Sequence, residues 1–268
     1  MVGAAPETTE GPRVPTRRVV ILGASNVTLG LSSLIESARA AWGSPLDILV
    51  AAGHGRSYGT TSTVLGRSLP AILQCGLWEE LAGRTPLPTA ALLTDIGNDL
   101  IYGRDVPVIL QWVEACLTRL QPVVDRLVVT RLPLASLQRT APWKLRLLIS
   151  LIFPSSRLEL TSALDQAREL DAQLITFAGR FRAYVVQPDV DWYRWDPIHV
   201  TRARRAEAWQ KYLSCWCDGE KNSSPRDSLC QWLTVVRARP QQWRYWGRAR
   251  QRQQPCVTFA DGTRLSLF

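Results

Sequence analysis

Short apolar runs rich in β-branched residues alternate with amphipathic stretches along most of this chain, and no other feature constrains its fold as strongly. The runs cover residues 17–23, 46–53, 89–97, 125–134 and 182–188. Each resembles a strand buried on both faces of a parallel sheet. Between the runs, apolar residues recur at intervals of three and four, which predicts helices over 27–42, 69–81, 109–120, 164–177 and 206–216.

Strands that alternate with helices predict an α/β fold, with a five-stranded, mainly parallel sheet between two layers of helices. In such a sheet, ligands bind beyond the carboxyl ends of the strands, near the point where the strand order reverses. Functional residues should therefore stand just after the predicted strands.

The ends of the sequence differ in composition from this central part. Residues 1–16 are rich in Pro, Gly and Thr and are predicted to form a flexible leader. They lack the apolar segment of a secretory signal. No apolar stretch reaches the roughly 20 residues that cross a bilayer. We therefore expect a soluble, cytoplasmic protein with its main domain at 17–217.

The cysteines do not predict a metal site. All six lack CxxC spacing and a nearby histidine, so we expect reduced, mostly buried thiols. Neither a metal nor a cofactor is predicted. The cysteines are Cys75, Cys116, Cys215, Cys217, Cys230 and Cys256.

Polar motifs follow the first three predicted strands. The sequence GASN (23–26) places Ser25 in a strand-to-helix turn, where free backbone N–H groups can stabilise an oxyanion. In GHGRSYG (53–59) the glycines let the backbone approach a ligand closely. The third motif, GND (97–99), offers the amide of Asn98 as a hydrogen-bond donor.

The chain has only two histidines, and one of them lies close to a carboxylate. His199 follows Asp196 by three residues in DPIH, after the fifth predicted strand. A carboxylate can fix the tautomer and orientation of an imidazole that moves protons. The order of the motifs predicts a hydrolytic centre in which Ser25 is the nucleophile, His199 the base and Asp196 the orienting group.

Other polar residues are weaker candidates for these roles. The second histidine, His54, has no carboxylate near it in sequence and is expected in the pocket wall. Among the acids, Asp95 is expected inside a strand, Asp99 flanks the site, and Asp191 lies eight residues before His199.

The four motifs, in this order over residues 18–217, resemble those of the SGNH hydrolases, the GDSL-type esterase and lipase superfamily. The resemblance implies a flavodoxin-like sheet and a triad of Ser25, His199 and Asp196. It also implies an oxyanion hole formed by the Ser25 N–H, a glycine N–H and the Asn98 side chain. The implied activity is the cleavage of a small-molecule or lipid carboxylic ester through an acyl-enzyme.

The sequence departs from the family pattern in two places. Ala24 stands where the family usually has an aspartate before the serine. In the second motif Gly53, Gly55 and Gly59 compete as the oxyanion donor, and Gly55 is preferred because it lies a few residues past the strand. We expect Asn26, His54 and Gly53 to contact the substrate.

Two segments leave alternatives open. Residues 141–154 are either a packed helix or a lid that touches lipid surfaces. Residues 219–268 carry nine basic and three acidic residues of a chain whose net charge is +9, and a boundary near Asp218 sets off the extension 218–268. This Trp- and Arg-rich extension is predicted to pack on the main domain, with an Asp-Gly hairpin at 257–268. Binding of single-stranded nucleic acid is the alternative for this extension.

Two other functions fit the same motifs. An acyltransferase, such as an acetyltransferase, would use the same triad and exclude water. A catalytically inactive binding module would depend on the basic extension. Pocket depth depends on residues 56–68 and 135–160, which are expected to be loops.

Overall fold

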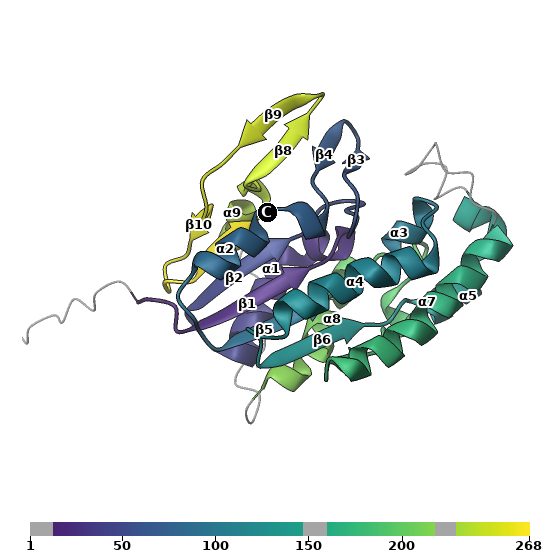
Figure 1. Cartoon of the computed structure of the whole chain (residues 1–268), viewed down its shortest axis with the longest axis horizontal. Coiled ribbons are helices and arrows are strands. Elements are labelled where there is room, and N and C mark those ends of the chain that lie inside the picture. The colour runs from purple at the N-terminus through teal and green to yellow at the C-terminus, as the bar shows by residue number, and fades with distance from the viewer. Residues whose placement is uncertain (1–12, 147–159, 218–228) are drawn as a thin grey trace, which may run out of the picture.

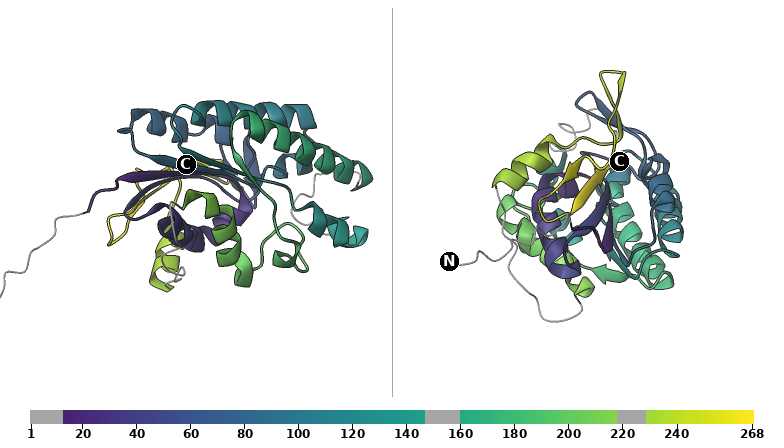
Figure 2. Two further views of the ribbon diagram at one scale, coloured as in Figure 1. Left: turned by 90° about the horizontal axis from the view of Figure 1, so that it is seen from below. Right: turned by 90° about the vertical axis from the view of Figure 1, so that its left-hand side faces the viewer.

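The computed structural model describes residues 13–146, 160–217 and 229–268, and its centre is a seven-stranded sheet with helices on both faces (Figures 1 and 2). The strand order is β10-β11-β2-β1-β5-β6-β7. The strands are β1 (Arg17–Leu22), β2 (Leu46–Ala51), β5 (Thr89–Leu93), β6 (Arg126–Thr130), β7 (Tyr184–Val186), β10 (Val257–Thr258) and β11 (Arg264–Leu267).

The predicted three-layer α/β class is confirmed, with more strands than expected. The five predicted strands pair in parallel in the order β2-β1-β5-β6-β7. From the C-terminal segment, β11 adds in parallel to β2, and β10 pairs with β11 in the antiparallel sense. The strand β1 is apolar because it lies in the middle of the sheet, where its side chains are fully buried. These are Val19, Val20, Ile21 and Leu22.

Two layers of helices cover the sheet. One layer contains α1 (Ser25–Trp42), α8 (Arg205–Tyr212) and α9 (Leu229–Arg237), and its core includes Trp192, Trp209 and Trp216. The other contains α2 (Leu77–Gly83), α4 (Val106–Leu120) and α7 (Leu160–Arg180). Shorter helices are α3 (Asn98–Ile101) and α5 (Leu134–Arg139), and single 3₁₀ turns are η1 (Ile72–Gln74), η2 (Val190–Trp192), η3 (Arg202–Arg204) and η4 (Ser214–Trp216).

Strand order places the candidate site at the sheet's switch point. The chain leaves β1 toward α1 on one face, and β1 lies between β2 and β5. At such a point the loops after neighbouring strands diverge and leave room for a ligand. Ser25 follows β1, and Asn98 follows β5.

The helix predicted over 69–81 is wrong in its first half, and part of the expected 56–68 loop is a hairpin. Residues 62–64 form β3 (Ser62–Val64) and residues 67–69 form β4 (Arg67–Leu69). Pro70 and Gly76 then interrupt helical hydrogen bonding, so that only η1 and α2 remain helical. Strands of three residues are too short to show a period of two in the sequence.

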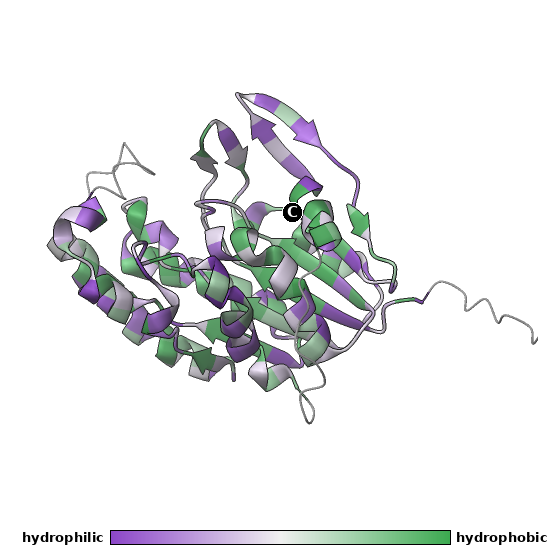
Figure 3. Ribbon diagram, turned by 180° about the vertical axis from the view of Figure 1, so that it is seen from behind, coloured by the Kyte–Doolittle hydropathy of each residue, from purple (hydrophilic) through white to green (hydrophobic). Residues whose placement is uncertain are grey.

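A second, four-stranded antiparallel sheet projects from the domain near the top of Figure 1. Its order is β3-β4-β8-β9, where β8 (Gln242–Tyr245) and β9 (Arg248–Gln251) belong to the C-terminal extension. Figure 3 shows hydrophilic residues along β8 and β9, in contrast to the hydrophobic strands of the central sheet.

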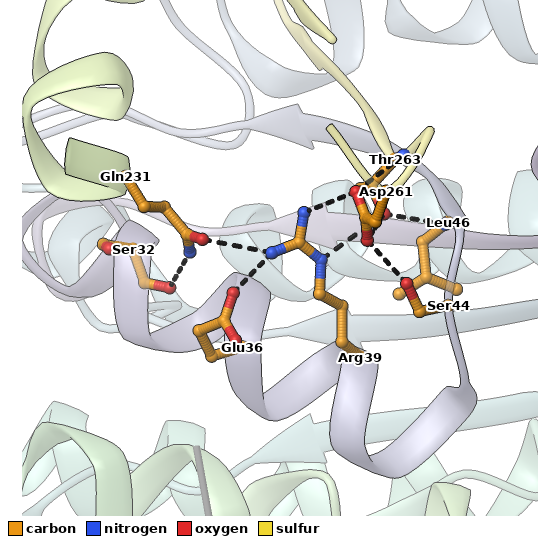
Figure 4. Close-up of polar contacts among 8 residues, drawn as sticks. All are labelled: Ser32, Glu36, Arg39, Ser44, Leu46, Gln231, Asp261 and Thr263. Carbon is orange, nitrogen blue, oxygen red and sulfur yellow. Dashed lines mark hydrogen bonds and ion pairs between the residues drawn. The ribbon is translucent and has the colours of Figure 1, made fainter. Parts of the chain in front are cut away.

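Arg39 of α1 joins the C-terminal extension to the main domain (Figure 4). Its guanidinium donates to Gln231 of α9 at 3.1 Å and to Asp261, before β11, at 3.1 Å. Although partial burial acts in the opposite direction, hydrogen bonds from Ser44 and Thr263 hold the pKa of Asp261 below its usual value. These side-chain bonds add to the strand pairings that bring the extension into both sheets.

Some expectations concern residues outside the described ranges. The leader up to residue 12, the boundary near 218 and residues 147–154 of the candidate lid lie outside the described residues. Of that lid, residues 142–146 are helical, with Trp143 61% exposed and Leu145 buried. In the described part of the chain, no helix combines the length and apolarity required to span a bilayer.

Gly30 allows α1 and α8 to pack closely. A Cβ at this position would lie 2.6 Å from the Trp209 indole nitrogen. We expect Gly30→Ala to lower the free energy of unfolding by about 1–3 kcal/mol in urea titrations, because the buried ring must shift. Gly179→Ala in α7 is the control, since its Cβ would meet nothing within 4 Å and alanine favours a helix. Equal stability changes in the two variants would contradict this account.

Candidate active site

A serine, a histidine and an aspartate from distant parts of the chain form a continuous hydrogen-bonded relay. Ser25 is the first residue of α1, whereas Asp196 and His199 lie in the segment between η2 and η3. The Nε2 atom of His199 is 2.8 Å from the Ser25 Oγ, and its Nδ1 is 2.6 Å from the Asp196 Oδ2. Such an arrangement can withdraw a proton from the hydroxyl while the carboxylate stabilises the resulting imidazolium.

The loop around Asp196 holds its carboxylate in place. Oδ1 accepts the backbone N–H groups of Ile198 at 3.0 Å and His199 at 3.2 Å. Partial burial alone would raise the pKa of Asp196, but the hydrogen bond and charge of His199, together with these N–H groups, lower it overall. The carboxylate therefore stays ionised at neutral pH and fixes the proton of His199 on Nδ1.

Asp95 supplies a carboxylate to the turn that contains Ser25. Oδ2 accepts the backbone N–H groups of Ala24 at 2.9 Å and Asn26 at 3.1 Å. The expectation that Asp95 lies within a strand is wrong, because β5 ends at Leu93 and Asp95 has φ +59° in the following loop. Its carboxylate thus reaches the Ser25 turn from the end of the neighbouring strand β5. It supplies the hydrogen-bond acceptor that the side chain of Ala24 lacks.

Asn26, expected to contact substrate, bonds to the segment that carries His199. Its Nδ2 donates to Asp95 at 2.8 Å and to the Ile198 carbonyl at 2.9 Å, while its Oδ1 accepts the Val200 N–H at 2.9 Å. These bonds flank His199 on both sides. The amide of Asn26 therefore positions the imidazole against Ser25.

Asn98 offers an unused donor to the same site. It is the first residue of α3, it lines the same cavity as Ser25, and its buried Nδ2 has no hydrogen-bond partner among the described residues. A buried donor without a partner costs free energy, so a ligand oxygen would stabilise it. The Ser25 N–H, at the amino end of α1, is a second donor near the hydroxyl.

The three candidate glycines differ in what surrounds them. Gly59 N–H already donates to the Ser57 Oγ at 3.2 Å, and a Cβ at Gly59 would lie 2.0 Å from the Trp112 ring. Gly53 packs against Leu69, and Gly55 has φ +59°, a conformation that favours glycine. Packing against Trp112 therefore accounts for the glycine at position 59. Gly53 and Gly55 remain the candidate oxyanion donors of the second motif.

His54 lies close enough to the relay to feel its charge. Its ring is partly exposed. Partial burial, and then the positive charges of His199 and Arg67, lower its pKa. His54 is therefore neutral at neutral pH. The sequence alone does not predict that the charge of Arg67 acts on His54, because this depends on the pairing of β4 with β3.

Asp99 connects the second motif to the third. Its carboxylate accepts the Ser57 hydroxyl and, at 3.0 Å, the Tyr58 N–H. Burial raises the pKa of Asp99 to about 6, despite these hydrogen bonds.

Another flanking acid, Asp191, is on the surface and lies 3.8 Å from Arg139. Asp196 is thus the carboxylate that contacts His199 directly.

An apolar cavity of about 140 Å³ opens beside Ser25 and Asn98. It lies between the loops after β5 and β6 and the helices α5 and α7. Because the cavity is predominantly apolar, it suits a hydrocarbon group next to the hydroxyl. Its apolar lining includes Ile96, Leu100, Leu132, Leu137, Leu145 and Leu164.

Comparisons find similarity to solved structures only. No protein family model matches the chain, and neither does any curated protein. The psychrotrophic esterase EstA from Pseudoalteromonas sp. has 13% identity and a TM-score of 0.47, over 74% of this chain and 97% of that chain. The M. smegmatis aryl esterase has 13% identity and a TM-score of 0.47, over 74% of this chain and 96% of that chain. AlinE4, an SGNH-hydrolase family esterase, has 18% identity and a TM-score of 0.42, over 76% of this chain and 94% of that chain.

The raised pKa of Asp99 makes a specific contribution to pH-dependent stability. Its pKa rises from 3.8 to about 6 on folding, so the folded state binds the proton more tightly. This contribution is full below the unfolded pKa and is lost as the pH rises through about 6. We expect the unfolding free energy of the wild type to fall relative to that of Asp99→Asn by about 3 kcal/mol between about pH 4 and pH 7.

Urea titrations at several pH values would measure this difference. Asp165→Asn is the matched control, because its side chain is 72% exposed and should give a difference that does not change with pH. A constant difference for Asp99→Asn over the same range would contradict the assignment.

Proposed function

We propose that the chain is a serine hydrolase of the SGNH type that cleaves carboxylic esters. The hydrogen-bonded relay from Asp196 through His199 to Ser25, ending at an apolar cavity, is the observation that carries this proposal. The resemblance of the four motifs supports the same activity.

The reaction has two stages. His199 takes the proton of Ser25 as the hydroxyl oxygen attacks the ester carbonyl, and Asp196 stabilises the imidazolium. His199 then donates the proton to the departing alcohol, which leaves an acyl group on Ser25. Water, deprotonated by His199, attacks this acyl-enzyme and releases the acid and the free serine.

The negative charge of each tetrahedral intermediate needs donors that are already in place. Asn98 Nδ2 and the Ser25 N–H are proposed for this role, with Gly55 or Gly53 as the third donor. Since the Nδ2 atom of Asn98 has no partner among the described residues, it can bind the oxyanion without breaking a bond within the protein.

Substitution of the nucleophile and of a donor tests this mechanism. We expect Ser25→Ala to lower kcat on p-nitrophenyl esters by about 10⁴-fold or more, and Asn98→Ala by about 10²- to 10³-fold. Asn98→Asp, which keeps the size but removes the donor, should be no better.

Ser37→Ala is the matched control on the same helix, because its buried hydroxyl has no partner among the described residues. This variant should retain full activity. A Ser25→Ala variant that folds and remains fully active would refute the proposal. Product analysis with a competing alcohol would detect acyl transfer in place of hydrolysis.

The cavity size predicts the preferred acyl chain. A dry cavity of about 150 Å³ can hold benzene, which has about six non-hydrogen atoms. We therefore expect kcat/KM on p-nitrophenyl esters to rise about fourfold per methylene from acetate to about hexanoate, and then to stop rising. Longer chains would have to leave part of their length outside the cavity.

Ala167→Leu on α7 should fill the cavity, since Ala167 is buried and lines it. The preference for hexanoate should disappear in this variant, while kcat/KM on acetate stays unchanged. An unaltered chain-length profile would show that the acyl group binds elsewhere.

A further inference from the structure

The two hairpins of the second sheet share a turn sequence that ordinary hairpins avoid. Residues 64–67 read VLGR and residues 245–248 read YWGR. Leu65 and Trp246 have φ of +49° and +48°, and the following glycines have +75° and +76°. Two consecutive positive φ values are typical of a type I′ turn, whose first position favours Asn, Asp or Gly. Bulky side chains there carry a conformational cost.

These turns also expose their apolar side chains. Leu65 is 92% exposed, Trp246 73% and Tyr245 51%. The tips lie side by side, because β4 pairs with β8 and the Trp246 N–H donates to the Gly66 carbonyl at 2.9 Å. Figure 1 shows both hairpins projecting from the same side of the domain. The strained turns thus expose apolar side chains instead of packing them in the core, which favours an external partner.

Arginines surround these hairpin tips (residues 64–67 and 245–248). Arg248 pairs with Tyr245 and Arg250 with Trp243 across β8 and β9, so guanidinium and aromatic groups share one face. No acidic residue occurs in 48–78 or 228–260, the segments that contain this sheet. Among the described residues, no ion pair neutralises Arg244, Arg248 or Arg250. The surface therefore complements a negatively charged partner.

We propose that the hairpin tips dock onto an anionic lipid surface. Leucine gains from burial among acyl chains, tryptophan and tyrosine favour the interfacial region, and arginines bind anionic headgroups. Single-stranded nucleic acid would share the charge and the aromatic stacking, but it offers nothing for a leucine. One face of the Trp246 ring is also occupied, since it lies against Gly66 of the other tip.

The docking surface adjoins the candidate active site. The loop 52–61 contains His54 and leads directly into β3, and the charge of Arg67 on β4 reaches His54. A docked hairpin pair would therefore hold the cleft near the lipid. The docking itself does not require the proposed hydrolase activity, and Ser25→Ala should bind vesicles as the wild type does.

Vesicle sedimentation with the full chain tests this proposal. We expect binding to vesicles of phosphatidylcholine mixed with phosphatidylserine, with much weaker binding to phosphatidylcholine alone. The double variant Leu65→Asn/Trp246→Asn should bind at least about tenfold more weakly, because it lacks both apolar tips. Asparagine tolerates the left-handed conformation, so the turns are preserved.

The matched control is Val14→Asn/Val123→Asn, which removes two exposed apolar side chains that precede β1 and β6, at the opposite ends of the strands. Its binding should equal that of the wild type. Arg248→Gln/Arg250→Gln should reduce binding to the mixed vesicles only. No binding of the wild type to the mixed vesicles, or wild-type binding by the asparagine double variant, would overturn the proposal. Salt-sensitive binding of oligothymidylate without vesicle binding would overturn it in favour of nucleic acid.

Discussion

One carboxylate, that of Asp95, joins the three chain segments on which the candidate site depends. It accepts hydrogen bonds from the backbone of the Ser25 turn and from the Asn26 side chain. Asn26 in turn bonds the backbone on both sides of His199. Charge-assisted bonds of this kind are about twice as strong as neutral ones, and a carboxylate at a helix amino terminus also interacts favourably with the helix dipole. The distance between Ser25 and His199 therefore depends on a residue that contacts neither side chain.

The sequence predicts the parallel sheet and the order of the motifs because both leave a local signal. Buried strands such as β1 are continuous apolar runs, and polar residues follow them. The role of Asp95 leaves no such signal, since it depends on how β5 ends and on which strand lies beside it. Similarly, the second sheet is built from strands of three and four residues with leucine and tryptophan at the turns, so neither periodicity nor the usual turn residues reveal it.

The C-terminal extension completes the central sheet as well as the second one. Without β11, β2 would present an open edge to solvent, and such edges promote aggregation. Asp47 on β2 is buried with Arg18, and it also pairs with Arg84, whose guanidinium donates to Ser266 of β11 at 2.9 Å. A buried pair of this type is costly unless every partner is present. The extension and the main domain therefore share this buried charge network as well as the pairing of β11 with β2.

The electrostatics of the cleft bear on the proposed mechanism, because it needs a positive His199 in a strongly basic chain. In the proposed reaction, proton transfer from Ser25 makes His199 positive, and a second positive imidazole close to it would oppose this charge. His54 is the histidine that could supply one, but partial burial and the charges of His199 and Arg67 lower its pKa. Partial burial, His199 and Arg67 thus keep His54 neutral, while Asp196, hydrogen-bonded to the Nδ1 of His199, stays ionised. In the proposed mechanism, an ionised Asp196 and a neutral His54 together favour the charge-separated state in which Ser25 attacks.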